Sequence, residues 1–185
     1  MSKTIIIYDS KYGHTKQYAH WLAEELNADI CEAKKKDVNT FNDYDTIIFG
    51  SSLYAGRSKA ALLVLKHFKK IQYKKVVLFT CGIADLSKES NIININKALD
   101  KVITPEIRSR IAIFYLRGGI DSERLSFLHK TMLKMVYSQL SKKPEQELTD
   151  EHRDLLATYG KKIDFSDKKM LEPMIEYCRD NQDKQ

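Results

Sequence analysis

Four apolar segments recur along the chain, and each is followed by a short loop of small or polar residues. The segments 4–9, 46–50, 76–80 and 111–115 are rich in Ile, Val and Phe. Runs with so little charge are typical of strands buried on both faces, as in a parallel sheet. Helical patterns of 3.6-residue period lie between them. Strands that alternate with helices predict a doubly wound α/β sheet, in which ligands bind at the carboxyl ends of the strands.

The rest of the chain completes one domain, which we expect to span residues 1–185 because this length suits a single core. A short strand is expected at 28–33. A helix from Ser58 is expected to bury Ala61, Leu62, Leu65 and Phe68, and another is expected at 85–102. After the last apolar segment we expect an insert of about 122–148, with one long basic helix over 122–143. Shorter helices are expected at 150–161 and 167–179, the second becoming regular only from Pro173.

Composition excludes several classes of protein. The net charge is +6, but the lysines are scattered, so we expect a solvated basic surface and no nucleic-acid partner. Cys31, Cys81 and Cys178 form no CxxC pair, so we expect neither a metal site nor a disulfide framework. No apolar run is long enough to cross a bilayer, and the first residues enter a strand directly. We therefore expect a cytoplasmic protein.

The turn after the first strand has the character of an anion site. Ser10 to Thr15 supply two hydroxyls and a Gly just before a helix begins, where free N–H groups and the helix dipole favour negative charge. The loop lacks both GxxxxGK[ST] and GxGxxG, so its size suits one phosphate monoester. An ordinary polar turn is the alternative, and Lys11 is as readily a solvated lysine as a phosphate partner. Three similar loops at the same edge favour binding.

Two of these loops resemble a known family. The segment 8–15, YDSKYGHT, resembles the FMN-phosphate loop of flavodoxins. The segment 44–56, YDTIIFGSSLYAG, is similar to the second flavin loop of one branch, the menaquinone-dependent protoporphyrinogen dehydrogenases and their flavodoxin-domain relatives. Residues 118–128, 133–136 and 163–167 are also similar to that branch. The resemblance implies a flavodoxin-like five-stranded parallel sheet of order 2-1-3-4-5, a long helical insert after the last strand, and FMN as cofactor.

Carried onto this sequence, the resemblance implies contacts with both ends of FMN. The phosphate would be bound by Ser10, Lys11, Tyr12, Gly13, His14 and Thr15. The flavin ring would be lined by Ser52, Leu53, Tyr54, Ala55 and Gly56, its other edge by Thr80, Cys81, Gly82 and Ile83, and its rim by Gly118 and Gly119. Residues 84–90 contain no aromatic side chain to stack on the ring. We therefore expect one flavin face to be open.

Individual side chains have competing interpretations. Asp9 is expected to cap a loop N–H, and His14 to be a hydrogen-bonded loop residue rather than a proton donor. Cys81 is expected to be inert packing rather than a reactive thiol. For Tyr54, stacking on the flavin is favoured over simply covering the loop. Arg57, if it lies near the N1–O2 edge of the flavin, is expected to raise its reduction potential.

The resemblance also implies an activity, the oxidation of protoporphyrinogen IX in heme biosynthesis with a quinone as acceptor. The chemistry would be carried by the flavin, so no protein acid or base is named as catalytic. Two alternatives stay open: a non-enzymatic electron shuttle with a redox partner protein, and an FMN-dependent NAD(P)H:quinone reductase. The basic helix 122–143 either docks on the domain, contacts an anionic membrane surface, or shapes the porphyrinogen or partner site.

Overall fold

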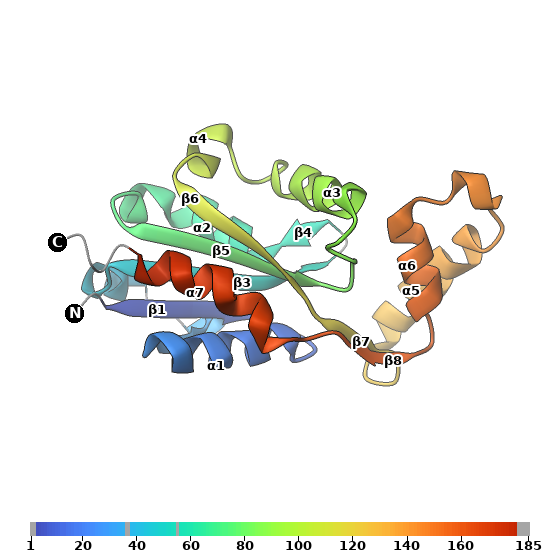
Figure 1. Cartoon of the computed structure of the whole chain (residues 1–185), viewed down its shortest axis with the longest axis horizontal. Helices are drawn as coiled ribbons and strands as arrows, with labels where there is room; N and C mark the ends of the chain where they lie inside the picture. Colours follow the sequence, from blue (N-terminus) through green and yellow to red (C-terminus); the bar gives the residue numbers. More distant parts are fainter. Residues whose placement is uncertain (1–2, 36–37, 55, 181–185) are drawn as a thin grey trace.

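A parallel sheet of order β2-β1-β3-β5-β6 forms the centre of the protein (Figure 1). The computed structural model describes residues 3–35, 38–54 and 56–180. The strand order confirms the predicted 2-1-3-4-5 topology, because β4 is only a short strand paired with the end of β3. The strands are β1 (Thr4–Asp9), β2 (Asp29–Glu32), β3 (Thr46–Tyr54), β4 (Arg57–Ser58), β5 (Lys75–Gly82) and β6 (Ile111–Arg117).

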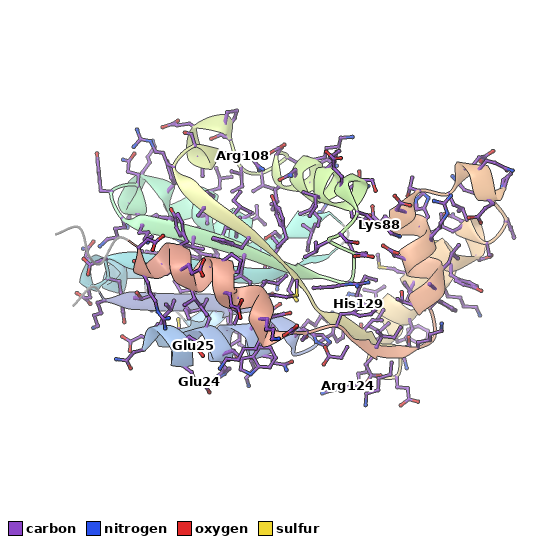
Figure 2. The ribbon with its side chains drawn as sticks, in the orientation of Figure 1. Glu24, Glu25, Lys88, Arg108, Arg124 and His129 are labelled. Atoms are coloured by element: carbon purple, nitrogen blue, oxygen red, sulfur yellow. The ribbon has the colours of Figure 1, made fainter. Side chains whose placement is uncertain are left out.

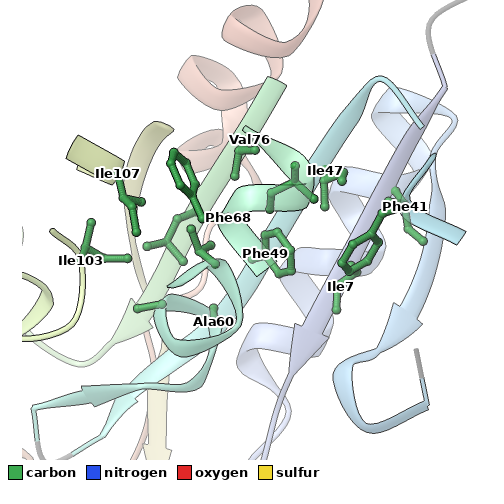
Figure 3. Close-up of a cluster of buried hydrophobic side chains, with 14 of the residues drawn as sticks. Ile7, Phe41, Ile47, Phe49, Ala60, Phe68, Val76, Ile103 and Ile107 are labelled. Atoms are coloured by element: carbon green, nitrogen blue, oxygen red, sulfur yellow. The ribbon is translucent and has the colours of Figure 1, made fainter. Parts of the chain in front are cut away.

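The sheet is buried on both faces because successive residues of each strand point to opposite sides. Ile5 and Ile7 of β1 join a cluster on one face, while Ile6 and Tyr8 join a cluster on the other. Figure 3 shows the first cluster, in which Phe49 lies between side chains of α2 and Phe41, with 6.1 Å between the two Phe ring centroids. The covering helices are α1 (His14–Leu26) and α7 (Glu172–Arg179) on one face, and α2 (Lys59–Ile71), α3 (Glu89–Leu99) and α4 (Pro105–Arg108) on the other.

Helix α2 differs from the prediction in the face that it buries. Leu62 and Leu65 are 49% and 42% exposed, whereas Val64 and Ile71 are fully buried, and the expected Ala61 and Phe68 are buried as predicted. Two overlapping apolar stripes satisfy the helical period in this segment, and periodicity does not choose between them. The point where the helix begins decides which stripe is buried. The Ser58 side chain accepts a hydrogen bond from the Ala61 N–H and starts the helix directly after β4.

The insert after β6 is larger than predicted. It is bracketed by two short antiparallel strands, β7 (Gly119–Asp121) and β8 (Lys162–Asp164), so it runs over 122–161 rather than 122–148. The expected single helix over 122–143 is α5 (Phe127–Leu140), which starts late because Ser126 caps it. The helix expected at 150–161 is α6 (Asp150–Thr158), preceded by the short turn η3 (Glu145–Glu147). Figure 1 shows this insert beyond the carboxyl ends of the central strands.

The remaining segments are short helical turns. η1 (Ala33–Lys35) and η2 (Val38–Asp43) follow β2, and the helix predicted at 85–102 is the shorter α3. The helix predicted at 167–179 is divided into η4 (Lys168–Leu171) and α7, with Pro173 in the first turn of α7 as expected. Among the described residues, no helix has the length and apolar character needed to cross a membrane.

Candidate functional site

The loop between β1 and α1 has the local geometry of an anion site. The Ser10 Oγ accepts a hydrogen bond from the Gly13 N–H at 3.2 Å, which closes the loop. Gly13 has φ of 105°, a conformation that favours glycine, and it precedes a helix that has no side-chain cap at this end. The first N–H groups of α1 therefore have no acceptor within the helix. This arrangement fits a phosphate group, with backbone N–H donors and the helix dipole directed at it.

Thr15 and Cys81 lie inside the protein beneath this loop. Thr15 is buried, and its hydroxyl is hydrogen-bonded to the Cys81 thiol. Burial raises the pKa of Cys81 to about 12, so at neutral pH the residue is a protonated thiol with little nucleophilic character. This agrees with the interpretation of Cys81 as inert packing. Thr15 offers its backbone N–H at the start of α1, while its hydroxyl is engaged in the interior.

His14 lies against the base of the insert. Its Nδ1 is 3.1 Å from the Ser166 Oγ and 3.4 Å from the Asp164 Oδ1. Burial would raise the pKa of Asp164, but hydrogen bonds from Ser166 and the charge of His14 hold it below its ordinary value. A Cβ on Gly118 would lie 3.1 Å from the His14 Cβ, and one on Gly119 would lie 2.7 Å from the His14 Cε1. The two glycines thus make room for His14, which is hydrogen-bonded as expected but is the first residue of α1 rather than a loop residue.

His129 on α5 contacts the same loop from the insert. Its Nε2 is 3.2 Å from the Lys11 Nζ, and its Nδ1 is hydrogen-bonded to the Tyr12 hydroxyl. The imidazole is 9% exposed and meets the Tyr12 ring edge-on, with 5.7 Å between centroids. Burial and the nearby Lys11 ammonium lower the pKa of His129, which favours the neutral ring. Lys11 is an exposed residue, but its ammonium lies within hydrogen-bond distance of the insert.

The second loop is more regular than predicted. β3 continues to Tyr54 and turns back as β4, with Tyr54 paired with Arg57 and Leu53 paired with Ser58. Ser51 and Ser58 join their buried hydroxyls at 2.9 Å. Ala55 lies outside the described residues, and the expected stacking of Tyr54 stays a prediction. Arg57 is exposed.

The sequence indicated that Asp9, at the end of β1, would cap a loop N–H. In the structure it has a different partner. Its carboxylate is paired with the Lys59 ammonium at 3.1 Å. Lys59 is the first residue of α2, a helix that contacts both β3 and β1. The prediction was wrong about the partner because α2 brings a cation to this edge of the sheet from 50 residues away. The pair is largely exposed, so it contributes little to stability.

A cleft of about 600 Å³ lies at the carboxyl ends of β3, β5 and β6. One wall holds five residues predicted to contact the flavin, namely Leu53, Gly56, Thr80, Gly82 and Ile83. The opposite walls come from α3 and from α6 of the insert, and they include Ile95, Lys97, Lys101, His152 and Leu155. The lining thus combines apolar side chains with charged ones of both signs, because Glu151 and Asp154 line the cleft as well as the two lysines. Ser52, Cys81, Gly118, Gly119 and the loop Ser10–Thr15 do not line this cleft, although they lie at the same edge of the sheet.

Helix α6 of the insert forms one wall of the cleft, and the open flavin face expected from the sequence stays a prediction. Asp154 on α6 accepts hydrogen bonds from the Lys88 ammonium at 2.9 Å and the Asn91 amide at 3.0 Å. Ser90 donates to Asp150 at 2.8 Å in the same interface. Figure 2 places Lys88 where α3 meets the insert. Residues 84–90 after β5, here called the third loop, contain no aromatic residue, as noted from the sequence. Helix α6 lies over this loop instead.

Sequence reasoning missed His129 and the residues of α6. Ser126 and Thr149 are typical N-cap residues three positions before His129 and His152, and both cap their helices in the structure. That pattern indicates where the helices start, but not which part of the sheet they reach. In the described part of the chain, no cluster of His, Cys, Asp or Glu is arranged to hold a metal ion.

Comparisons with known proteins identify what this fold and site are similar to. The family model described as "Flavodoxin domain" matches residues 5–147. An uncharacterised protein of Methanocaldococcus jannaschii is 34% identical over 82 residues, which are 43% of this chain and 55% of that protein. The chain thus spans about half the length of that relative.

Two solved structures are similar at low identity. A flavoprotein in complex with FMN from Lactobacillus acidophilus is 16% identical, with a TM-score of 0.40 over 63% of this chain and 93% of that one. Flavodoxin 2 from Bacillus cereus is 19% identical, with a TM-score of 0.41 over 66% of this chain and 90% of that one.

Proposed function

Because this chain belongs to the flavodoxin-domain family, we propose that it binds FMN and acts as a redox flavoprotein. The uncapped start of α1 and the loop closed by Ser10 and Gly13 fit the phosphate of the cofactor. The walls of the cleft at the ends of β3 and β5 suit the isoalloxazine ring. Bound FMN supplies an N5 atom that accepts a hydride or single electrons, so the protein supplies position and electrostatics.

The activity that we propose is oxidation of protoporphyrinogen IX, with a quinone as acceptor. The observation that carries this proposal is the cleft between the sheet and the insert, in which residues of α3 and α6 face the side chains predicted to line the flavin. Ile83, Ile95 and Leu155 offer apolar walls suited to a macrocycle. Lys97 and Lys101 line the same cleft and suit the carboxylates of such a substrate. An electron shuttle needs an accessible flavin edge but no enclosed space of this kind.

In this proposal the residues of the chain position the substrate and exclude water. Apolar side chains from α3 and α6 remove water from the macrocycle, and the two lysines orient its acidic groups. The hydrogen bonds of Asp154 hold α6 over the third loop and so keep the wall of the cleft in place.

The proposal is tested by anaerobic mixing of FMN-loaded protein with protoporphyrinogen IX, followed by addition of a quinone. We expect the visible flavin band to bleach and then to return. The double variant Lys97→Glu/Lys101→Glu should need about five- to tenfold more substrate for half-maximal bleaching, because each exposed pair contributes up to ~1 kcal/mol. The exposed Lys66→Glu on α2 is the matched control and should behave as wild type. Loaded protein that never bleaches would favour the electron shuttle.

A further inference from the structure

His129 of the insert contacts the predicted phosphate end of the site. His129 lies in the first turn of α5, and its two ring nitrogens contact two consecutive residues of the loop, Lys11 and Tyr12. Figure 2 shows His129 near the start of α5, on the side of the insert nearer the sheet. Since the imidazole is 9% exposed, this is a packed contact rather than a surface encounter.

The chemistry of the three groups fixes the direction of both hydrogen bonds. A lysine ammonium has donors and no acceptor, so the His129 Nε2 accepts from Lys11. The neutral ring then carries its proton on Nδ1, which donates to the Tyr12 oxygen. Lys11 uses one of its three N–H groups in this way and keeps the others for an anion at the start of α1. His129 therefore positions the Lys11 ammonium at the loop and leaves its other N–H groups able to bind an anion.

Other contacts of the insert link the position of His129 to the segment that carries α6. The base of the insert meets His14 through Asp164, and α6 meets the third loop through Asp154 and Lys88. Tyr137 of α5 stacks on Tyr159 next to α6, with ring centroids 3.9 Å apart. A shift of α5 away from the loop therefore disturbs the segment that carries α6.

We propose that His129 makes the insert part of the cofactor site, because it couples binding of the FMN phosphate at Ser10–Thr15 to docking of the insert. The inference rests on the proposed binding of FMN. A phosphate that fixes Lys11 and Tyr12 also fixes the partners of His129, so FMN stabilises the docked insert. By thermodynamic reciprocity, a docked insert tightens the binding of FMN by the same factor. His129 is a positioning residue that acts through Lys11 and Tyr12.

The first test compares FMN with riboflavin, which lacks the phosphate, in titrations of the cofactor-free protein followed by flavin fluorescence. His129→Ala should weaken FMN binding about five- to twentyfold and leave riboflavin binding within twofold. In a double-mutant cycle, Lys11→Ala combined with His129→Ala should cost less than the sum of the two changes. Ser138→Ala, an exposed change on the same helix, is the control and should bind both flavins as wild type.

The second test measures docking by trypsin cleavage after Arg124, an exposed residue in the turn before α5 (Figure 2). FMN should slow this cleavage at least about fivefold in the wild type, riboflavin should not, and FMN should protect His129→Ala less than twofold. Equal FMN affinity in wild type and His129→Ala, or faster cleavage with FMN, overturns the coupling and leaves FMN binding intact. A wild type that binds no FMN overturns the proposed function instead.

Discussion

The sheet and the insert are held together by different kinds of contact. In the sheet, large side chains such as Phe49, Phe79 and Tyr18 are completely buried between strands and covering helices. In the insert, Phe127 is 87% exposed on α5, and His129 and Asp154 contact the rest of the protein through hydrogen bonds. Burial of apolar area is the main favourable term in folding, so the sheet determines whether the chain folds at all.

This difference indicates which part of the protein can change conformation when a ligand binds. A unit held by a few hydrogen bonds can open while the apolar core stays folded, because its local opening free energy is smaller than that of global unfolding. The insert is also the unit that closes the cleft and contacts the phosphate loop. Parts of a protein that move during binding are drawn from such regions.

The largest expected effect comes from the same substitution made in the two regions. Phe79→Ala should lower the free energy of unfolding by about 3–5 kcal/mol, because it leaves a cavity in a packed core. Phe127→Ala should change it by less than about 0.5 kcal/mol, because the side chain is already in solvent. Urea denaturation followed by circular dichroism measures both. A cost of several kcal/mol for Phe127→Ala would show that the two regions are not held differently.

A smaller and local effect is expected when Asp154 is changed. Asp154→Ala removes the acceptor of Lys88 and Asn91, so amide hydrogens of α6 should exchange at least about tenfold faster while those of β3 and β5 do not change. Asp100→Ala is the matched control, since it breaks an ion pair with Arg108 that lies away from the insert (Figure 2). Uniform exchange changes across the sheet would contradict independent opening of the insert.

The same contact gives the sign of a pH dependence. Burial would raise the pKa of Asp154, but Lys88 and Asn91 hold it below the ordinary value of 3.8. A carboxyl with a lowered pKa in the folded state stabilises at pH above that ordinary value, and the contribution is lost as the pH falls through the lowered pKa. Docking of α6 through Asp154 should therefore not change with pH near neutrality, and it should weaken below about pH 4.

The smallest expected effect concerns Arg57, which is exposed on β4. If it tunes the flavin, Arg57→Ala should lower the two-electron reduction potential of the FMN-loaded protein by about 5–20 mV. An exposed charge contributes up to ~1 kcal/mol, and 1.4 kcal/mol corresponds to about 30 mV in such a couple. Redox titration against a reference dye measures the shift, with the exposed Lys69→Ala on α2 as control. An unchanged or higher potential in Arg57→Ala would remove this residue from the site.

Most of the sheet was predictable because its signals are local. Ile5, Ile6 and Ile7 indicate a strand buried on both faces whatever the rest of the chain does. The φ of 105° at position 13 favours glycine, and α1 begins at the next residue. The loop Ser10–Thr15 could therefore be predicted as a candidate anion site from a few neighbouring residues.

The insert was not predictable in the same way, because its decisive contacts join residues far apart in the chain. β7 pairs with β8 over about 40 residues, and this pairing moves the end of the insert from 148 to 161. His129 meets Lys11 across 118 residues. Hydrophobic periodicity and turn residues do not predict contacts between residues so far apart in the sequence.

The sequence by itself determined the alternating α/β pattern, the strands buried on both faces and the polar loops at their carboxyl ends, because hydrophobic period and turn chemistry act over a few residues. Only the tertiary structure decided which stripe of α2 is buried, that α6 rather than an aromatic side chain covers the third loop, and that His129 joins the insert to the phosphate loop. Those outcomes depend on which surfaces meet when the chain closes, and several arrangements satisfy the same local pattern.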